Sequence, residues 1–199
     1  MKSLIDYMED KLNSIKSRNL LYTNIRNFFK DLEILEVETP VLGKYGTSDP
    51  YIDQLSCSVK NKLFYLQSSP EFFMKKLIAE LKCSIFQITK AFRKDQIGQN
   101  HSLEFSMLEW YRIGFDYLDL ITEVDSLMQL LLKTKPALRI TYDQIFFKYF
   151  SFFPSKINFK DLKKFASSLP LVKDIVKDCI DKTDLLQVIF TFYIEKYLS

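Results

Sequence analysis

Two segments, Ala91-Phe-Arg-Lys-Asp95 and Phe105-Ser-Met-Leu-Glu-Trp-Tyr111, decide the fold of this chain. Each has the alternation typical of a strand, and residues 94–104 form a polar connection between them. Alternation places Thr89, Ala91, Arg93 and Asp95 on one side of the first strand, and Phe105, Met107, Glu109 and Tyr111 on one side of the second. A face that mixes aromatic, thioether and carboxylate groups with an arginine is poorly suited to a hydrophobic core. It is well suited to binding a nucleotide and an amine. The alternative is a surface hairpin in which Arg93 pairs with Glu104 or Glu109.

This stretch resembles motif 2 of the class II aminoacyl-tRNA synthetases. More narrowly, it resembles the elongation factor P lysyltransferases, which are paralogues of lysyl-tRNA synthetase. The resemblance rests on Phe92-Arg-Lys-Asp95, Gly98, His101, Glu104-Phe105 and Met107-Leu-Glu-Trp-Tyr111. In two places the chain departs from the family pattern, because Asp95 replaces a Glu and Ser102 replaces a frequent Asn.

The resemblance implies adenylation, in which an amino-acid carboxylate attacks the α-phosphate of ATP and no covalent enzyme intermediate forms. Arg93 is then the cation that bridges the carboxylate and the phosphate. Magnesium accompanies ATP, and no metal-binding side chain is assigned. The implied ATP contacts are Arg93, Lys94, Asp95, His101, Ser102 and Phe105, the last stacking on adenine. The implied substrate contacts are Ser69, Pro70, Glu71, Met107, Glu109 and Tyr111, of which Glu109 and Tyr111 recognise ammonium groups.

Ser69-Pro-Glu71 predicts the start of a helix that runs to about Lys82. Ser69 would be the N-cap, Pro70 the first helical residue, and Glu71 a first-turn acid. This pattern needs no function. Its place before motif 2, however, matches the T-S-P-E segment that borders the amino-acid pocket in the family, with Ser68 where a Thr is usual.

Helices and strands are also indicated elsewhere. We predict a short helix over residues 4–16, then a helix with a stripe from Leu21 to Leu32, then a strand with Leu35, Val37 and Thr39 that ends at Pro40. Helix, strand and Pro together resemble motif 1 and imply a homodimer. Residues 55–59 and 63–67 predict a hairpin. Four helices are expected after Arg112. The first carries an apolar stripe from Leu120 to Leu131, and the second begins with a Thr141/Gln144 capping box. The third is capped by Asn158, and the fourth covers residues 184–197.

We therefore expect an α+β fold, a class II synthetase-like antiparallel sheet flanked by helices. Residues 1–112 would form the motif 1 and motif 2 core, and residues 113–199 a helical region. We find no counterpart of motif 3, the family's glycine-rich strand and helix. The sequence thus predicts a partial catalytic domain, incomplete at its C-terminus.

Composition excludes several other functions. The net charge of +3 neither demands nor excludes a nucleic-acid partner. Cys57, Cys83, Cys179 and a single His lack the spacing of a zinc site, which favours free thiols in a reducing cytoplasm. No segment approaches the roughly 20 apolar residues of a membrane helix. A P-loop and a Ser-His-Asp set are also absent from the sequence.

Three functions remain open. The first is ATP-dependent activation of (R)-β-lysine, or lysine, and its transfer to a lysine of elongation factor P. The second is a truncated, non-catalytic module for dimerisation or ligand binding. The third is a lysyl-tRNA ligase-like enzyme. The missing N-terminal oligonucleotide-binding barrel favours a protein acceptor over tRNA.

Overall fold

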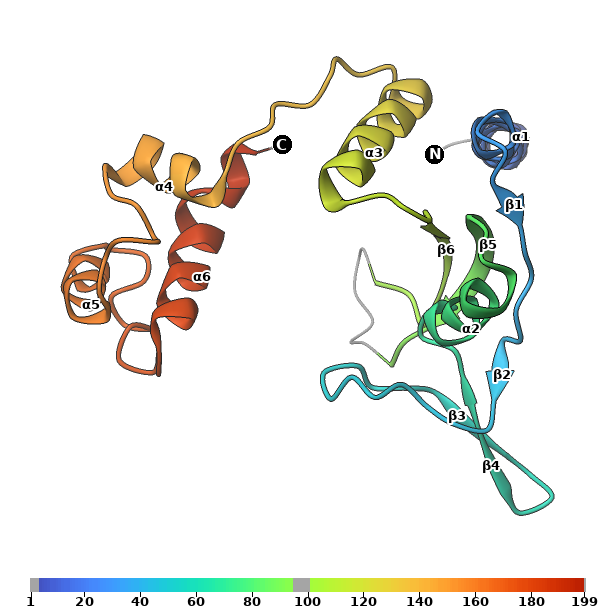
Figure 1. The fold of residues 1–199 in the computed structure, drawn as a ribbon, viewed down its shortest axis with the longest axis horizontal. Helices are drawn as coiled ribbons and strands as arrows, with labels where there is room; N and C mark the ends of the chain where they lie inside the picture. The colour runs from blue at the N-terminus through green and yellow to red at the C-terminus, as the bar shows by residue number, and fades with distance from the viewer. Residues whose placement is uncertain (1–3, 95–100, 199) are drawn as a thin grey trace. The chain divides into compact units, whose positions relative to one another are not determined.

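The computed structural model describes residues 4–94 and 101–198 (Figure 1). The chain divides into two compact units, Met1–Pro136 and Ala137–Ser199. Residues 113–136, which the sequence assigns to the helical region, thus group with the sheet. Two small, mainly antiparallel sheets together with helices confirm the α+β fold class.

The first unit is built on two long strands, β5 (Ile85–Phe92) and β6 (Glu104–Tyr111). They pair antiparallel along their whole length, as the alternation predicts. β1 (Leu35–Glu36) pairs parallel to the other side of β5, giving the order β1-β5-β6. The strand predicted over Leu35, Val37 and Thr39 is therefore shorter than expected. After Glu36, the Val37 backbone N–H still donates to the Phe86 carbonyl at 2.9 Å.

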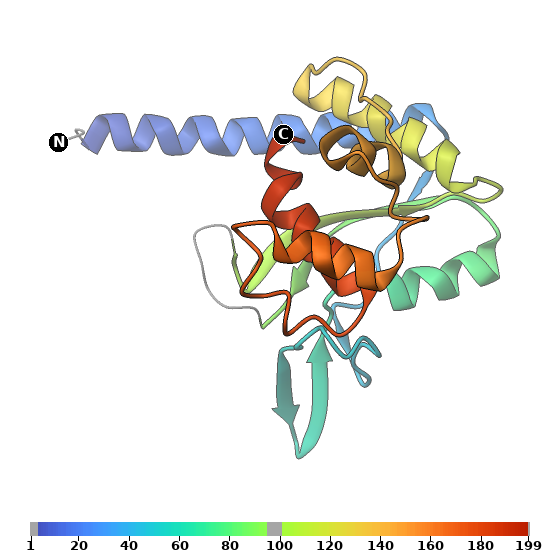
Figure 2. The same cartoon turned by 90° about the vertical axis from the view of Figure 1, so that its left-hand side faces the viewer.

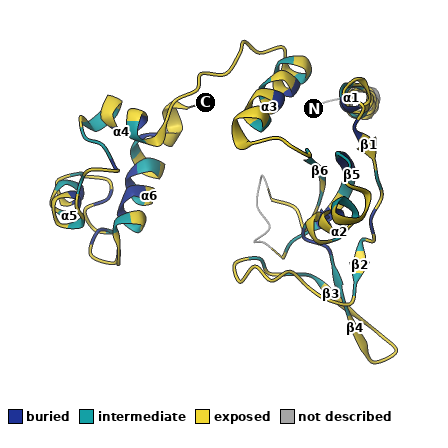
Figure 3. Cartoon of the chain, in the orientation of Figure 1, coloured by how far each residue is buried: buried dark blue, intermediate teal, exposed yellow. Residues whose placement is uncertain are grey.

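One face of this sheet packs on two helices, α1 (Leu4–Asp31) and α3 (Tyr117–Leu132) (Figures 1 and 3). The ring of Phe29 stacks on Phe86 at 4.5 Å and meets Trp110 at 5.4 Å. The cluster consists of Phe86, Ile88, Leu108 and Trp110 from the sheet with Ile25, Phe28, Phe29, Ile34, Leu127 and Leu131. The helices cover this face, so Glu109 and Tyr111, which alternate with Leu108 and Trp110 along β6, lie on the opposite one.

α1 is one continuous helix, and the prediction of two separate helices was wrong. No Gly or Pro interrupts residues 4–31, so the first segment propagates directly into the second. Residues 8–21 are exposed, and this part of the helix extends beyond the sheet (Figure 2).

A second sheet has the order β2-β4-β3, with β2 (Leu42–Gly43), β3 (Ser56–Val59) and β4 (Lys62–Leu66). Lys60 and Asn61 have φ of 50° and 62°, the left-handed pair that a two-residue hairpin turn requires. The predicted hairpin is thus confirmed. The Gln67 N–H donates to the Val41 carbonyl and the Phe92 N–H to the Gln67 carbonyl, both at 2.9 Å, so the residue after β4 joins the two sheets.

α2 (Glu71–Leu81) begins one residue later than predicted, and Pro70 occupies the cap position. The Met74 N–H donates to the Pro70 carbonyl, which makes this the first turn. Ser69 still supports the start, because its hydroxyl accepts a hydrogen bond from the Glu71 N–H at 3.1 Å. The helix ends before Lys82, a left-handed residue.

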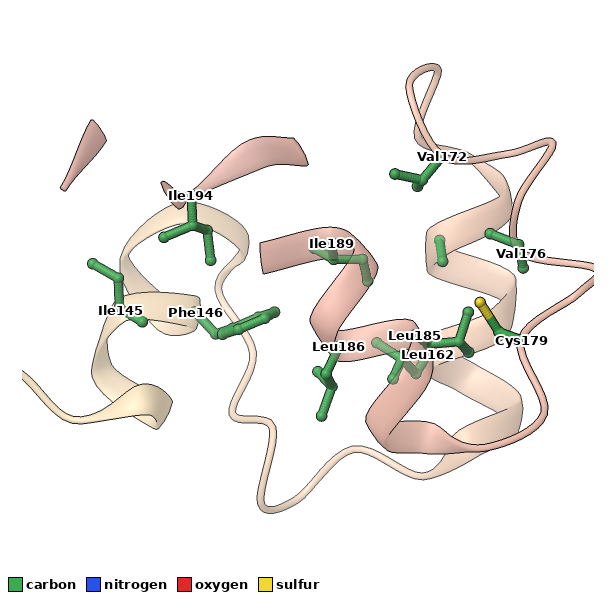
Figure 4. Close-up of a cluster of buried hydrophobic side chains, with 11 residues drawn as sticks. Ile145, Phe146, Leu162, Val172, Val176, Cys179, Leu185, Leu186, Ile189 and Ile194 are labelled. Carbon is green, nitrogen blue, oxygen red and sulfur yellow. The ribbon is translucent and has the colours of Figure 1, made fainter. Parts of the chain in front are cut away.

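The second unit contains α4 (Tyr142–Phe150), α5 (Phe159–Ser167), α6 (Lys182–Tyr193) and a 3-10 turn, η1 (Glu195–Tyr197). The Thr141/Gln144 capping box and the Asn158 cap are confirmed. α6 starts earlier than predicted, because the side chain of Asp181 accepts the Asp184 N–H and caps the helix. The hydrophobic core of the second unit centres on Phe146, Leu162, Leu185 and Ile189 (Figure 4). In the described part of the chain, no helix is long and apolar enough to cross a membrane.

Candidate active site

The polar face of the main sheet gathers several predicted site residues. In the β5–β6 register, Ala91 lies opposite Phe105 and Thr89 opposite Met107. Directly paired residues of antiparallel strands point to the same face, so the alternate residues Phe105, Met107, Glu109 and Tyr111 share this face. The face is thus the one that the sequence pattern predicts.

Glu109 and Tyr111 form a pair at the end of β6. The Tyr111 hydroxyl donates to Glu109 Oε1 at 2.8 Å. Burial is the main cause that raises the pKa of Tyr111 well above its ordinary value, and the hydrogen bond to Glu109 and the negative charges of Glu109 and Glu71 raise it further. Tyr111 is therefore a neutral donor at physiological pH. Glu71, on α2, lies close enough to contribute to this negative region.

Arg93 lies just beyond β5 on the same side. Its Nε donates to the Ser68 carbonyl at 3.3 Å, and its guanidinium carbon lies 5.4 Å from the centre of the Phe105 ring. The Arg93 backbone N–H donates to the Leu103 carbonyl at 3.1 Å. Backbone and side chain are thus both held, which gives the cation a defined position at half-burial.

A cavity of about 400 Å³ adjoins Arg93. Its walls are the loop that follows β2, the end of β4, and the first turns of α2. Of the predicted residues, Ser69, Glu71 and Arg93 line it, whereas Pro70 is buried at the start of α2. The lining residues that sequence reasoning missed include Asp49, Gln54, Tyr65, Gln67 and Lys75.

Lys75 is the missed residue with a recognisable signal. It follows Glu71 by four residues on α2, the spacing at which helical side chains meet, and the two form an ion pair. The cavity wall therefore holds the Glu71 carboxylate together with its own cation.

Buried polar side chains fix the strand beneath this site. Gln67 Nε2 donates to Thr89 Oγ1 at 3.1 Å and to the Lys90 carbonyl at 2.8 Å, and Thr39 Oγ1 donates to Gln87 Oε1 at 2.9 Å. Gln67 Oε1 is buried and has no hydrogen-bond partner among the described residues.

Other predicted ATP contacts lie away from the cavity. Lys94 is exposed, with its Nζ 3.8 Å from Asp53 Oδ2. His101 and Ser102 are exposed, and Asp95 lies outside the described residues. Ser102, Phe105 and Met107 border a second cavity of about 610 Å³ between α1 and the sheet. The structure thus brings Ser69, Glu71 and Arg93 around one cavity, and does not bring Lys94, His101 and Ser102 to it.

No cluster of three or more His, Cys, Asp or Glu within residues 4–94 and 101–198 is arranged to hold a metal ion.

Comparison with known proteins identifies the family of this chain. The chain belongs to the class II tRNA synthetases (D, K and N), whose family model matches residues 2–184. Within that class it is similar to proteins named elongation factor P--(R)-beta-lysine ligase. The one from Vibrio cholerae is 37% identical over 190 residues, covering 92% of this chain and 58% of that protein. The one from Avibacterium paragallinarum is 34% identical over 200 residues, covering 94% and 59%.

The chain therefore spans less than two thirds of the length of these relatives. A solved structure, asparaginyl-tRNA synthetase from Pyrococcus horikoshii complexed with asparaginyl-adenylate, aligns with a TM-score of 0.55 at 20% identity. The alignment covers 60% of this chain and 27% of that one, and it supports the class II fold.

Proposed function

We propose that this chain supplies the carboxylate-activating part of a ligase that joins (R)-β-lysine to elongation factor P. One observation carries the proposal: Arg93 and the Glu109–Tyr111 pair lie on one face of the sheet, and Arg93 adjoins a cavity edged by Glu71. A fixed guanidinium suits a carboxylate and a phosphate, and carboxylates beside a neutral phenol suit ammonium groups. The names of the similar proteins support this choice of substrate and acceptor.

The proposed reaction has two steps. A carboxylate oxygen of (R)-β-lysine attacks the α-phosphorus of ATP, the bond to the β-phosphate oxygen breaks, and an acyl-adenylate and pyrophosphate form. The neutral ε-amine of a lysine on elongation factor P then attacks the acyl carbon, an amide forms, AMP leaves, and the amine proton passes to solvent. Arg93 stabilises the charge that gathers between carboxylate and phosphate in the first step.

The amino groups of the substrate have separate partners in this proposal. Glu109 accepts a hydrogen bond from an ammonium group of the substrate. The Tyr111 hydroxyl holds the Glu109 carboxylate in place through its 2.8 Å hydrogen bond. Glu71 offers a second carboxylate once its ion pair with Lys75 opens. Phe105 provides the ring for adenine, and Ser69, Pro70 and Met107 shape the substrate side. From the resemblance of this segment to the family's motif 2, Lys94, Asp95, His101 and Ser102 would contact ATP, with Asp95 near the adenine amino group and His101 near the β- and γ-phosphates. Magnesium would be bound together with ATP.

A homodimer formed through α1 in the cytoplasm is part of the same proposal. Met8, Leu12 and Ile15 lie one and two turns apart on α1 and are 63%, 50% and 59% exposed. An apolar stripe on an exposed helix is suited to pairing with its copy. Sedimentation of the chain and of a Leu12→Glu variant tests this, with a dimer expected only for the former.

A ligand-binding module without catalysis is the second candidate. The two candidates differ in pyrophosphate exchange. We expect the purified 199-residue chain to exchange pyrophosphate into ATP with (R)-β-lysine and magnesium, more than with L-lysine. An Arg93→Ala variant is the control and should show none. Binding of (R)-β-lysine without exchange, by chain shown to be folded, would favour the second candidate. Charging of lysine onto tRNA would instead support the lysyl-tRNA ligase.

A further inference from the structure

The loop over residues 44–54 forms one wall of the cavity without a helix or strand of its own (Figure 1). Its aromatic side chains add little packing, because Tyr45 is 81% and Tyr51 96% exposed. A segment with few buried apolar contacts depends on its hydrogen bonds to hold its position. The bonds that join this loop to its neighbours therefore set the shape of the cavity.

Gln54, at the end of the loop, makes two such contacts. Its Oε1 accepts from the Thr47 N–H at 2.6 Å, and its Nε2 lies 3.5 Å from Ser68 Oγ. A backbone N–H can only donate, so the first contact fixes which end of the amide faces Thr47. The amide thereby spans from the middle of the loop to the segment that precedes α2.

Gly46 leaves the space that this amide occupies. A Cβ on Gly46 would lie 2.2 Å from Gln54 Oε1 and 3.4 Å from a ring carbon of Tyr65. The backbone of Gly46 is not left-handed, so an alanine there would conflict with the amide and not with its own backbone conformation.

Ser68 connects the amide to Arg93. Its hydroxyl faces Gln54, and its carbonyl accepts from Arg93 Nε at 3.3 Å. On the other side of the loop end, the Asp53 carbonyl accepts from the Lys94 N–H at 2.9 Å. The end of the loop is thus held between two segments that both adjoin Arg93.

We propose that Gln54 is a positioning residue of this site. It holds residues 44–53 as a wall of the cavity and fixes Ser68, whose carbonyl orients Arg93, and Gly46 is needed to accommodate it. The effect on substrate binding rests on the function proposed above, whereas the effect on the loop does not.

Amide hydrogen exchange at Thr47, followed by NMR, tests the loop directly. For Gln54→Ala we expect exchange at the Thr47 N–H to rise about fivefold or more, the equivalent of one lost hydrogen bond. Gln54→Glu keeps the acceptor and should keep Thr47 protected. In the same samples, calorimetric titration with (R)-β-lysine should give about fivefold weaker binding for Gln54→Ala. The matched control is Gln187→Ala. Gln187 is an exposed glutamine of α6 whose Nε2 lies 3.4 Å from Thr191 Oγ1. Its replacement should change neither the exchange at Thr47 nor the affinity for (R)-β-lysine.

A double-mutant cycle separates this role from general destabilisation. Gly46→Ala alone should reproduce the exchange at Thr47 seen for Gln54→Ala, and should add nothing in the Gln54→Ala background, because its conflicting atom is then gone. Additive effects, or unchanged exchange at Thr47 in Gln54→Ala, would overturn the proposal. If exchange at Thr47 changes in the variants as expected but the wild-type chain does not bind (R)-β-lysine, the role of Gln54 in the loop is supported. The same result counts against the proposed ligase.

Discussion

Glu123 is the buried carboxylate that joins α3 to the back of β6, and we predict that its removal strongly destabilises the first unit. Its Oε1 accepts from Trp110 Nε1 at 2.8 Å, and its Oε2 lies 3.1 Å from Arg112 Nε. The side chains of Glu123 and Arg112 are only 7% and 14% exposed. The guanidinium of Arg112 also lies 4.2 Å from the centre of the Phe115 ring.

The magnitude follows from what each substitution leaves unpaired. Removing one member of a buried ion pair costs about 3–5 kcal/mol, because the other charge stays buried. For Glu123→Ala we therefore expect a loss of about 4 kcal/mol. Glu123→Gln keeps an acceptor for the Trp110 N–H, which would cost about 1–3 kcal/mol if left unpaired. We therefore expect Glu123→Gln to lose only about 2 kcal/mol of unfolding free energy. Arg112→Met with Glu123→Met buries no charge and should cost less than Glu123→Ala.

Urea unfolding followed by tryptophan fluorescence measures these free energies, because Trp110 is the only tryptophan in the sequence and reports on this unit. Glu80→Gln, which removes an exposed carboxylate from α2, is the control and should stay within about 0.5 kcal/mol of wild type. A loss under about 1 kcal/mol for Glu123→Ala, or equal losses for Ala and Gln, would refute the reasoning.

Three further predictions concern the site and the thiols. Arg93→Lys should lower (R)-β-lysine-dependent pyrophosphate exchange by about 100-fold or more, since an ammonium cannot present the planar fork of a guanidinium, while the urea midpoint stays near wild type; exchange within a few-fold of wild type would contradict this. The pKa of Tyr111 is raised in the fold, while the unfolded phenol ionises near about pH 10, so the stability it contributes is present below that pH and lost above it. Urea unfolding followed by circular dichroism should thus show that above about pH 10 the stability of Tyr111→Phe falls less steeply with pH than that of wild type. Parallel plots of stability against pH for the two proteins would count against this prediction. Burial raises the pKa of the Cys179 thiol whereas Cys57 is exposed, so peptide mapping should find iodoacetamide on Cys57 well before Cys179; equal rates would disprove this difference.

The elements that could be predicted from the sequence are those governed by neighbouring residues. The alternation in residues 85–92 and 104–111, the Lys60-Asn61 turn and the Thr141/Gln144 capping box all depend on contacts within a few positions. The predictions that failed were boundaries. α1 continued through a region with weak apolar periodicity, and α6 began earlier because the Asp181 side chain was available as a cap.

The site divides in the same way. Arg93, Glu109 and Tyr111 could be proposed from the sequence because they stand in one motif at strand spacing, and the common face of Glu109 and Tyr111 follows from the pleat. Gln54, Gln67 and Lys75 were missed, although Lys75 stood at helical spacing from Glu71. Gln54 meets Ser68 from fourteen residues away, and Gln67 meets Thr89 from twenty-two.

By itself, then, the sequence determined the strand pair, its polar face and the family to which the motif belongs. Tertiary structure alone decided that α1 and α3 cover the apolar face and that the loop over residues 44–54 closes one side of the cavity. The physical reason is that alternation and capping are local properties of the backbone. A cavity wall, by contrast, arises only when segments distant in the chain pair their buried polar groups with one another.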